Sequence, residues 1–217
     1  MSHTLLICDL DGTLIDSAPG IAEALRQACA SVGVEPITNP DRSVIGPPLD
    51  ALLKQIIGPL DAETLARLRL AFIESYDRDA YLLSKPFDGI QAMLQSVAEQ
   101  GHEMALATNK RFAPTSAILQ HFRWSGFFRS VETTDSKPHQ TRTKSEMLAD
   151  IRLGSGASIR SFFYLGDTEA DSQAAREAGM PCIMAHWGYG GASGIPADLK
   201  AFAPADVCAF LLDEGRR

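Results

Sequence analysis

Short apolar runs that stop at polar or glycine residues recur along the chain. Residues 4–8 form the first of these runs and end at Asp9, where the apolar character stops abruptly. A run of this length with such a boundary is typical of a buried β-strand. On this basis, strands are predicted at residues 4–8, 103–107, 128–133, 162–165 and 181–185.

Other segments carry apolar residues at three- and four-residue spacing, which predicts amphipathic helices. In residues 17–32, for example, Ile21 and Leu25 begin such a stripe. Thr143 and Glu146 match the capping box that opens many helices. The predicted helices cover residues 17–32, 48–57, 61–82, 89–100, 112–121, 144 to about 153, 169–178 and 205–213.

The order of these elements is uneven along the chain. One strand is followed by three predicted helices, and strands alternate with helices only from residue 85 onward. Such alternation is typical of an α/β fold with a doubly wound parallel sheet. The helical stretch is then an insertion after the first strand. We therefore expect an α/β core from residues 1–15 and 84–217, and a helical domain from residues 16–83.

Composition narrows the class of protein. Of the 217 residues, 45% are hydrophobic and 22% are charged, which is typical of a globular protein. No apolar stretch approaches the ~18 residues that a membrane span requires, so no membrane association is expected. The four cysteines lie far apart and form no CxxC pair, which favours reduced thiols in a cytoplasmic protein.

The charge of the chain limits its partners. Net charge is −7, and Lys and Arg form no basic stripe, which argues against nucleic acid as a partner. An anionic substrate would have to be held by local cations or a metal ion, because the field of an acidic protein repels it.

Polar side chains follow the predicted strands, and in open α/β sheets ligands bind at the carboxyl ends of the strands. Asp9 and Asp11 follow the first strand, Thr108 follows the second, and Asp167 follows a later one. Lys144 opens a helix and adds an ammonium group. Four separate segments therefore deliver carboxylates, a hydroxyl and an ammonium to one edge of the predicted sheet.

The two aspartates after the first strand point to a metal ion. Asp9 and Asp11 stand two positions apart, and side chains at that spacing in an extended chain point to the same side. Adjacent carboxylates repel each other, and a divalent cation relieves the repulsion. Mg²⁺ prefers oxygen ligands and often combines a few carboxylates with substrate phosphate. Asp167 and Asp171 can supply further oxygens.

Three motifs resemble those of the haloacid dehalogenase-like superfamily of phosphohydrolases. Residues 9–14 (Asp-Leu-Asp-Gly-Thr-Leu) resemble its first motif, Thr108-Asn109 its second, and residues 166–171 (Gly-Asp-Thr-Glu-Ala-Asp) its fourth. The stretch 164–190, with Trp-Gly-Tyr-Gly at 187–190, is most similar to the phosphoglycolate phosphatase branch. The resemblance covers nearly the whole chain. It implies a Rossmann-like core with an inserted α-helical cap domain.

The resemblance also implies a role for each matching residue. Asp9 would attack phosphorus and form an aspartyl-phosphate, while Asp11 would protonate the leaving alkoxide and then activate water. Thr108 would donate its hydroxyl to the phosphoryl oxygens. The implied Mg²⁺ ligands are Asp9, Asp167, Asp171 and the backbone carbonyl of Asp11; the implied substrate contacts are Gly12, Thr13, Asn109 and Lys144. Asn109 could instead cap the next helix.

The third motif of the family is a lysine, and two lysines compete for it. Lys137-Pro138 resembles the Lys-Pro pair of many members, whereas Lys144 opens a helix, where the helix N-terminus would act on the same anion. From Lys144 to Asp167 there are 23 positions (167 − 144), and from Lys137 there are 30 (167 − 137). Loop length therefore favours Lys144.

Two basic residues lie close to the second motif, and the acid of the first motif bears on the type of reaction. Lys110 and Arg111 directly follow the second motif and could flank the phosphate, but for Arg111 we expect surface exposure. By resemblance, an acid at position 11 separates this chain from the dehalogenase and phosphonatase branches. Phosphosugar mutases share it, so that distinction stays open.

The favoured function is a Mg²⁺-dependent phosphomonoesterase of the phosphoglycolate phosphatase type, acting on a small phosphorylated metabolite as a monomer or homodimer. The alternatives are a phosphosugar mutase of the β-phosphoglucomutase type and a catalytically silent phosphate-binding protein on the same fold.

Overall fold

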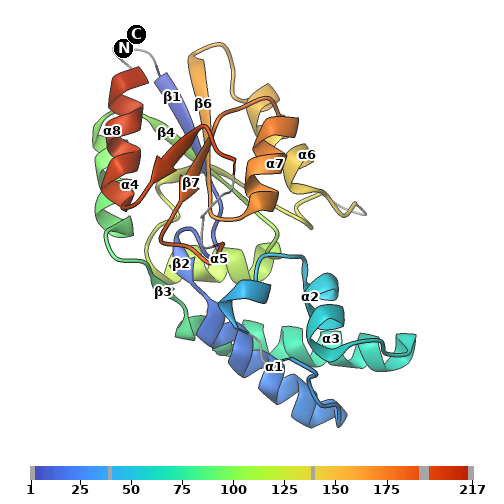
Figure 1. Cartoon of the computed structure of the whole chain (residues 1–217). Helices are drawn as coiled ribbons and strands as arrows, with labels where there is room; N and C mark the ends of the chain where they lie inside the picture. Colours follow the sequence, from blue (N-terminus) through green and yellow to red (C-terminus); the bar gives the residue numbers. More distant parts are fainter. Residues whose placement is uncertain (1–2, 39–40, 138–139, 191–195, 215–217) are drawn as a thin grey trace.

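A computed structural model describes residues 3–38, 41–137, 140–190 and 196–214 (Figure 1). The strands are β1 (His3–Cys8), β2 (Ile15–Asp16), β3 (Lys85–Pro86), β4 (Glu103–Thr108), β5 (Phe128–Thr133), β6 (Ile159–Gly166), β7 (Cys182–Ala185) and β8 (Leu199–Ala201). The α-helices are α1 (Ala18–Val32), α2 (Leu49–Ile57), α3 (Ala62–Arg78), α4 (Ile90–Glu99), α5 (Phe112–His121), α6 (Lys144–Gly154), α7 (Glu169–Glu177) and α8 (Pro204–Glu214). Two 3₁₀ helices, η1 (Arg42–Val44) and η2 (Ala80–Leu83), complete the described elements.

Six strands form one parallel sheet in the order β5-β4-β1-β6-β7-β8. Leu5 of β1 lies opposite Glu103 of β4 on one side and opposite Phe162 of β6 on the other. The chain moves outward from β1 through β4 to β5 and then returns to β6, so the strand order reverses beside β1. In folds of this kind the crevice at that reversal, at the carboxyl ends of the strands, is the ligand site.

The sheet is buried on both faces because its strands alternate between two apolar layers. In β1, Leu6 and Cys8 pack in the layer that includes residues of α4, α5 and α8. Leu5 and Ile7 point the other way and pack with residues of α6 and α7. The predicted doubly wound parallel α/β fold is confirmed.

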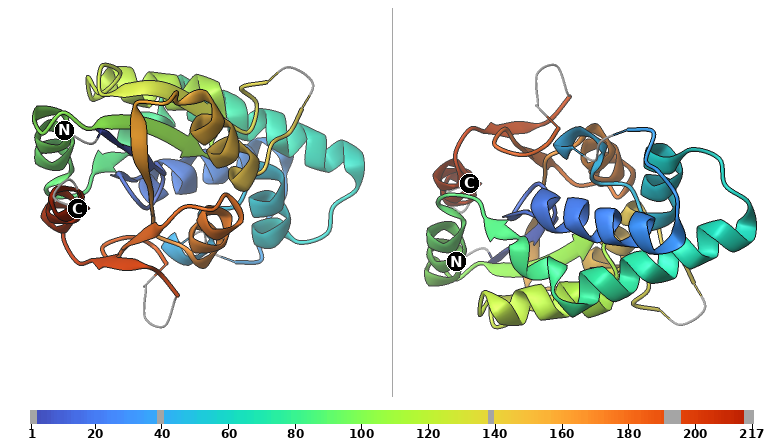
Figure 2. Two further views of the ribbon diagram at one scale, coloured as in Figure 1. Left: turned by 90° about the horizontal axis from the view of Figure 1, so that it is seen from above. Right: turned by 90° about the horizontal axis from the view of Figure 1, so that it is seen from below.

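Helices α1, α2 and α3 lie together beyond the carboxyl edge of the sheet, at the end of the molecule opposite to the two chain termini (Figures 1 and 2). Their facing side chains form a separate apolar cluster that includes Leu25, Leu53, Leu68 and Phe72. The chain leaves the core through β2 and returns through β3, and these two strands pair antiparallel with Ile15 opposite Pro86. The inserted α-helical cap is thus present.

The short strands and one helix boundary differ from the sequence prediction. β2, β3 and β8 were not predicted, because two or three residues are too few to show an alternating pattern. The helix predicted over 61–82 ends at Arg78, and the chain continues as η2. η2 packs closely on α1, since a Cβ on Gly20 would lie 2.3 Å from the Ala80 carbonyl oxygen. Within the described ranges, none of the helices combines the length and apolar character needed to cross a bilayer.

Candidate active site

A tight turn after β1 brings the first motif against the fourth. Gly12 has a φ of +80°, and its amide donates to the Ile15 carbonyl at 2.9 Å. A Cβ at Gly12 would lie 2.5 Å from a carboxylate oxygen of Asp167, so both the turn and this close approach require glycine. The loop that carries Asp9 and Asp11 is therefore held directly beside Asp167.

Asp9, Lys144 and Asp171 form a buried hydrogen-bonded group. The Lys144 ammonium donates to Asp9 Oδ2 at 2.7 Å and to Asp171 Oδ1 at 2.6 Å. Lys144 is the first residue of α6, and the capping box of Thr143 and Glu146 that was predicted there is confirmed. Helix α6 thus carries the ammonium to the end of β1.

The other lysine candidate lies elsewhere. Lys137 pairs with Asp150 at 2.5 Å, and its side chain is 49% exposed. Pro138, the second residue of the predicted Lys-Pro pair, lies outside the described residues. The structure therefore brings Lys144, rather than Lys137, to Asp9.

Asp171 is held by donors on every side. Its Oδ2 accepts from the amide and the hydroxyl of Thr168 and from the Asp167 amide, and its Oδ1 accepts from Lys144 and from the Tyr164 hydroxyl. With Thr168 it forms a second capping box, at the start of α7. The Lys144 ammonium thus contacts a carboxylate that is itself held in place by several donors.

Burial disfavours the charged forms of the side chains at this site and shifts their pKa values. It raises the pKa of Asp9 to about 7, because Lys144 only partly offsets desolvation and the repulsion from the other carboxylates. It raises the pKa of Asp167 to about 6, because the hydrogen bonds from Thr13 and Tyr189 only partly offset desolvation and the repulsion from Asp171. The pKa of Asp171 stays below its ordinary value despite its burial, because Lys144 and Thr168 favour the charged form. Burial alone would lower the pKa of Lys144, but Asp171 and Asp9 raise it above the ordinary value, so the ammonium stays protonated.

The Trp-Gly-Tyr-Gly segment wraps around Asp167. The Tyr189 amide donates to Asp167 Oδ2 at 2.7 Å, and the Thr13 hydroxyl donates to Oδ1 at 2.9 Å. A Cβ on Gly188 would lie 2.3 Å from the Asp167 Cβ. The backbone at Gly188 therefore packs so closely on Asp167 that no larger residue fits there. The Thr13 side chain, predicted to contact substrate, is fully buried and donates its hydroxyl hydrogen bond to Asp167.

Asp11 faces a buried cation that also touches the cap. Lys110 Nζ lies 3.0 Å from Asp11 Oδ2 and 4.6 Å from the centre of the Tyr76 ring on α3. The side chains of Lys110 and Asp11 are 8% and 13% exposed. Burial opposes the Lys110 charge, but Asp11 and Tyr76 raise the pKa of Lys110 above its ordinary value. Lys110 therefore joins the proposed acid–base residue to the cap.

The residues around Lys110 also reach the cap. The Asn109 side-chain amide donates to the Gly46 carbonyl at 3.0 Å, before α2. Arg111, expected at the surface, is only 21% exposed and makes two hydrogen bonds to the Asp77 carboxylate of α3, at 2.6 and 3.1 Å. Thr108, which ends β4, is buried and accepts from the Lys110 amide at 3.3 Å.

The cap contacts of Arg111 and Tyr189 were missed by sequence reasoning. The Tyr189 hydroxyl donates to Asp16 at 2.8 Å and accepts from the amides of Ser17 and Ala18, where the chain enters the cap. The conspicuous aromatic residue in a glycine-rich segment was a signal for Tyr189. For Arg111 there was no local signal, because its partner lies 34 positions earlier.

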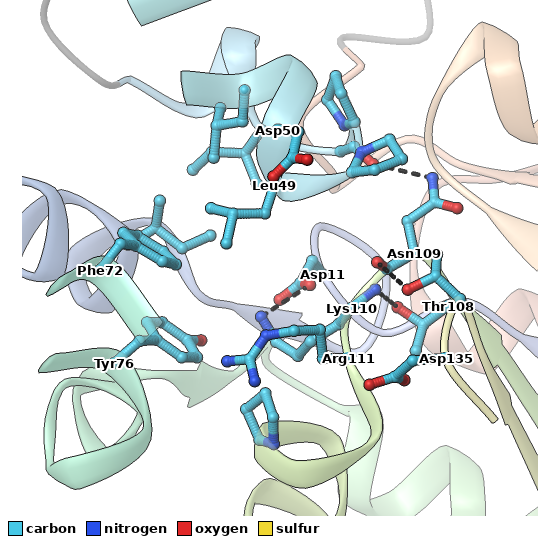
Figure 3. A pocket seen from close by; sticks show the side chains of 18 of the residues that line it. Asp11, Leu49, Asp50, Phe72, Tyr76, Thr108, Asn109, Lys110, Arg111 and Asp135 are labelled. Carbon is cyan, nitrogen blue, oxygen red and sulfur yellow. Dashed lines mark hydrogen bonds and ion pairs between the residues drawn. The ribbon is translucent and has the colours of Figure 1, made fainter. Parts of the chain in front are cut away.

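A cavity of about 320 Å³ lies between the core and the cap (Figure 3). Asp9, Asp11, Thr108 and Lys110 line its core side, and Leu49, Phe72 and Tyr76 are among the residues that line its cap side. Figure 3 shows Leu49, Phe72 and Tyr76 on the other side of the cavity from Thr108, and the Lys110 ammonium extends toward the Tyr76 ring.

The buried carboxylates fit a divalent cation. One oxygen each from Asp9, Asp167 and Asp171 lies within 4.8 Å of the other two. Asp9 Oδ1 is buried and has no hydrogen-bond partner within the described part of the chain. Three buried carboxylates lie around one ammonium, that of Lys144, so buried negative charge exceeds buried positive charge, and this excess is costly without a cation. An oxygen-only donor set suits Mg²⁺.

The parallel core, the inserted cap and the acidic site at the carboxyl edge define a class of hydrolases. Residues 6–185 match the family described as haloacid dehalogenase-like hydrolase, and the chain belongs to that family. The resemblance on which the motif assignments rest is therefore confirmed.

Relatives and solved structures extend this result. The chain is 33% identical to a phosphoglycolate phosphatase of Xylella fastidiosa over 85% of this chain and 80% of that protein. It is 28% identical to one of Aquifex aeolicus over 95% and 96%. A predicted phosphatase from Clostridium acetobutylicum has a similar fold, with a TM-score of 0.83, 23% identity and coverage of 98% of this chain and 100% of that chain.

Proposed function

We propose that this chain is a Mg²⁺-dependent phosphomonoesterase that acts through an aspartyl-phosphate on Asp9. The observation that carries the proposal is the buried, unpartnered oxygen of Asp9 at the edge of the cavity, with the other carboxylate oxygen held by Lys144. A carboxylate fixed through one oxygen presents the other as a nucleophile. The phosphatase class agrees with the names of the curated relatives.

In the first step, Asp9 Oδ1 forms a bond to phosphorus as the ester P–O bond breaks, and Asp11 gives its proton to the departing alkoxide. In the second step, Asp11 removes a proton from water, whose oxygen bonds to phosphorus as the bond to Asp9 breaks. The products are the alcohol and inorganic phosphate, and Asp9 and protonated Asp11 are restored. Thr108 lines the cavity and can donate its hydroxyl to phosphoryl oxygens.

The side chains of Asp9 and Asp167 are the ones with which the chain would hold Mg²⁺, together with the Asp11 carbonyl. When bound, the ion would supply positive charge to the phosphoryl oxygens. Asp171 would assist Mg²⁺ binding indirectly, because its two carboxylate oxygens already accept five hydrogen bonds. Lys144 would keep Asp9 oriented and neutralise part of the phosphoryl charge.

We further propose that residues 16–83 act as a cap and that residues 1–15 and 84–217 form the catalytic core. The contacts that support this division are those of Asn109, Lys110 and Arg111 to the inserted helices, made by three consecutive residues after Thr108. Cap closure would exclude bulk water from the aspartyl-phosphate.

The test is phosphate release from a panel of phosphate monoesters with and without Mg²⁺, for the wild type and Asp9→Asn. We expect turnover that needs Mg²⁺ and that Asp9→Asn reduces to background. Because the Asp9 carboxylate is buried and its pKa is raised, this variant should be at least as thermally stable as the wild type. Asp88→Asn, at an exposed turn away from the cavity, is the matched control and should keep wild-type turnover. Wild-type turnover in Asp9→Asn would refute the nucleophile.

A further inference from the structure

The cavity is larger than a phosphate and a two-carbon acid require. Its volume of about 320 Å³ falls within the range of pockets that accept complete small-molecule ligands, about 300–1,000 Å³. The phosphate would occupy the end beside Asp9 and Thr108. The remaining space extends toward the cap and must accommodate the alcohol part of the ester.

The cap side of this space is mostly apolar, with Asp50 and Arg69 as its charged residues among those described. Phe72 stacks on Tyr76 with ring centres 5.6 Å apart, and Figure 3 shows Leu49 on the same side of the cavity. The apolar lining residues on the cap are Ile21, Ile45, Pro47, Pro48, Leu49, Leu52 and Phe72. These side chains gain free energy by contact with apolar groups and offer no partner to a charge.

The cations at the cavity already have carboxylate partners. Among the described residues that line it, Lys110 pairs with Asp11 at 3.0 Å, Arg111 with Asp77 at 2.6 Å, and Arg69 with Asp50 at 3.0 Å. The first two pairs are mostly buried, and the third is about half exposed at the rim.

Besides the three paired aspartates, a further acid makes the cavity less favourable for an anion. Asp135 also lines the cavity, and its carboxylate accepts from the Phe112 amide and the Thr133 hydroxyl. A second anionic group on a substrate would therefore compete with Asp77 for Arg111 or with Asp50 for Arg69, and it would meet Asp135 nearby. Displacement is costly at the mostly buried pair of Arg111 and Asp77, because it leaves an uncompensated charge, and costs less at the half-exposed pair of Arg69 and Asp50.

From these observations we infer that the alcohol released by this enzyme is uncharged, largely apolar and larger than glycolate. The inference rests on the proposed phosphatase activity and names the substrate class of the same site. It separates this chain from the activity for which its curated relatives are named, because 2-phosphoglycolate carries a carboxylate. A phosphosugar mutase would likewise need free cations for a second phosphate.

The experiment compares benzyl phosphate with 2-phosphoglycolate in the presence of Mg²⁺. Both are monoesters of primary alcohols, so both require protonation of an alkoxide, and they differ in the charge and apolar surface of the alcohol. We expect kcat/KM for benzyl phosphate to be higher by about tenfold or more, as apolar pockets discriminate among ligands. Equal or faster hydrolysis of 2-phosphoglycolate would overturn the inference and leave the phosphatase intact. No turnover of any ester above Asp9→Asn would overturn the phosphatase itself.

Two variants test the physical cause. Leu49 is partly exposed on the cap wall and packs against the edge of the cap cluster, so Leu49→Lys places an added cation there at the cost of some apolar contact. It should move the preference toward 2-phosphoglycolate by about tenfold, whereas Leu49→Met should keep the preference for benzyl phosphate. Arg69→Leu removes the rim cation. A loss confined to 2-phosphoglycolate in Arg69→Leu would show that Arg69 receives a carboxylate, and it would overturn the inference.

Discussion

At the scale of single residues, the two aspartates of the first motif have different neighbours. In each, one carboxylate oxygen contacts a lysine, and the other is buried without a hydrogen-bond partner among the described residues. Asp9 shares Lys144 with Asp171, whereas Asp11 faces Lys110, which also lies against Tyr76 of the cap. Chemically equal groups can thus take unequal roles, nucleophile and acid–base catalyst, because their neighbours differ.

This difference predicts a specific defect in Asp11→Asn. Without the acid, turnover of alkyl phosphates should fall by about 10²–10⁴-fold. 4-Nitrophenyl phosphate has a leaving group that departs without a proton, so it should still phosphorylate Asp9. The second step lacks its base, and the aspartyl-phosphate should accumulate. We expect a burst of about one nitrophenol per enzyme, measured by stopped flow, with the phosphoryl group found on Asp9 by mass spectrometry. Normal turnover of alkyl phosphates would contradict the role of Asp11.

At the scale of elements, the loop after β4 connects the core to the cap. Arg111 reaches Asp77 of α3, and Asn109 reaches the Gly46 carbonyl before α2. The same loop follows Thr108, so the phosphate end of the cavity and the cap contacts belong to one short segment. These contacts can form only when the cap lies against the core, and they should therefore favour the closed arrangement.

A double-mutant cycle on Arg111 and Asp77 tests this connection. Each single change to alanine should lower kcat/KM, and the two losses should be non-additive by about 0.5–1 kcal/mol, because both remove the same partly buried pair. The control is Arg129 and Glu103, an ion pair on β5 and β4 away from the cavity. Alanine at those positions should leave kcat/KM unchanged. Additive losses at Arg111 and Asp77 would show that the pair does not act as a unit.

At the scale of the whole molecule, the buried carboxylates lower the stability of the metal-free protein when they are ionised. Burial raises the pKa of Asp9 to about 7 and that of Asp167 to about 6, above the ordinary value of about 4 for an unfolded aspartate. The folded state therefore binds more protons than the unfolded state between these values. The stability of the metal-free protein should fall as the pH rises through this window. The pKa of Asp171 is lowered, so its contribution is lost only at pH values below this window.

The prediction is that Mg²⁺ stabilises the protein more at about pH 8 than at about pH 5.5, because protons compete for Asp9 and Asp167 at the lower pH. Thermal unfolding with and without Mg²⁺ at both pH values measures the effect. Asp167→Asn should remove most of the dependence on Mg²⁺. A Tm that Mg²⁺ changes equally at both pH values would contradict the assignment of these two carboxylates.

Much of the fold was predictable because its signals are local. The buried strands are continuous apolar runs, and the helix from Lys144 opens on a capping box of adjacent residues. β2, β3 and β8 were not predictable, since their short length carries no period and their pairing is decided by distant segments. Just after the break between α3 and η2, the Ala80 carbonyl packs against Gly20 of α1, which lies far away in the sequence.

Residue type and short spacing were enough to predict the longer strands and the helices, the polar residues at the strand ends and the family to which the chain belongs. Three contacts became visible only in the folded chain: the hydrogen bond from Thr13 to Asp167, the pairing of Arg111 with Asp77, and the pairing of Lys110 with Asp11. Charge pairing and burial depend on which segments meet in space, so the surroundings of the alcohol part of a substrate were fixed only when the cap packed on the core.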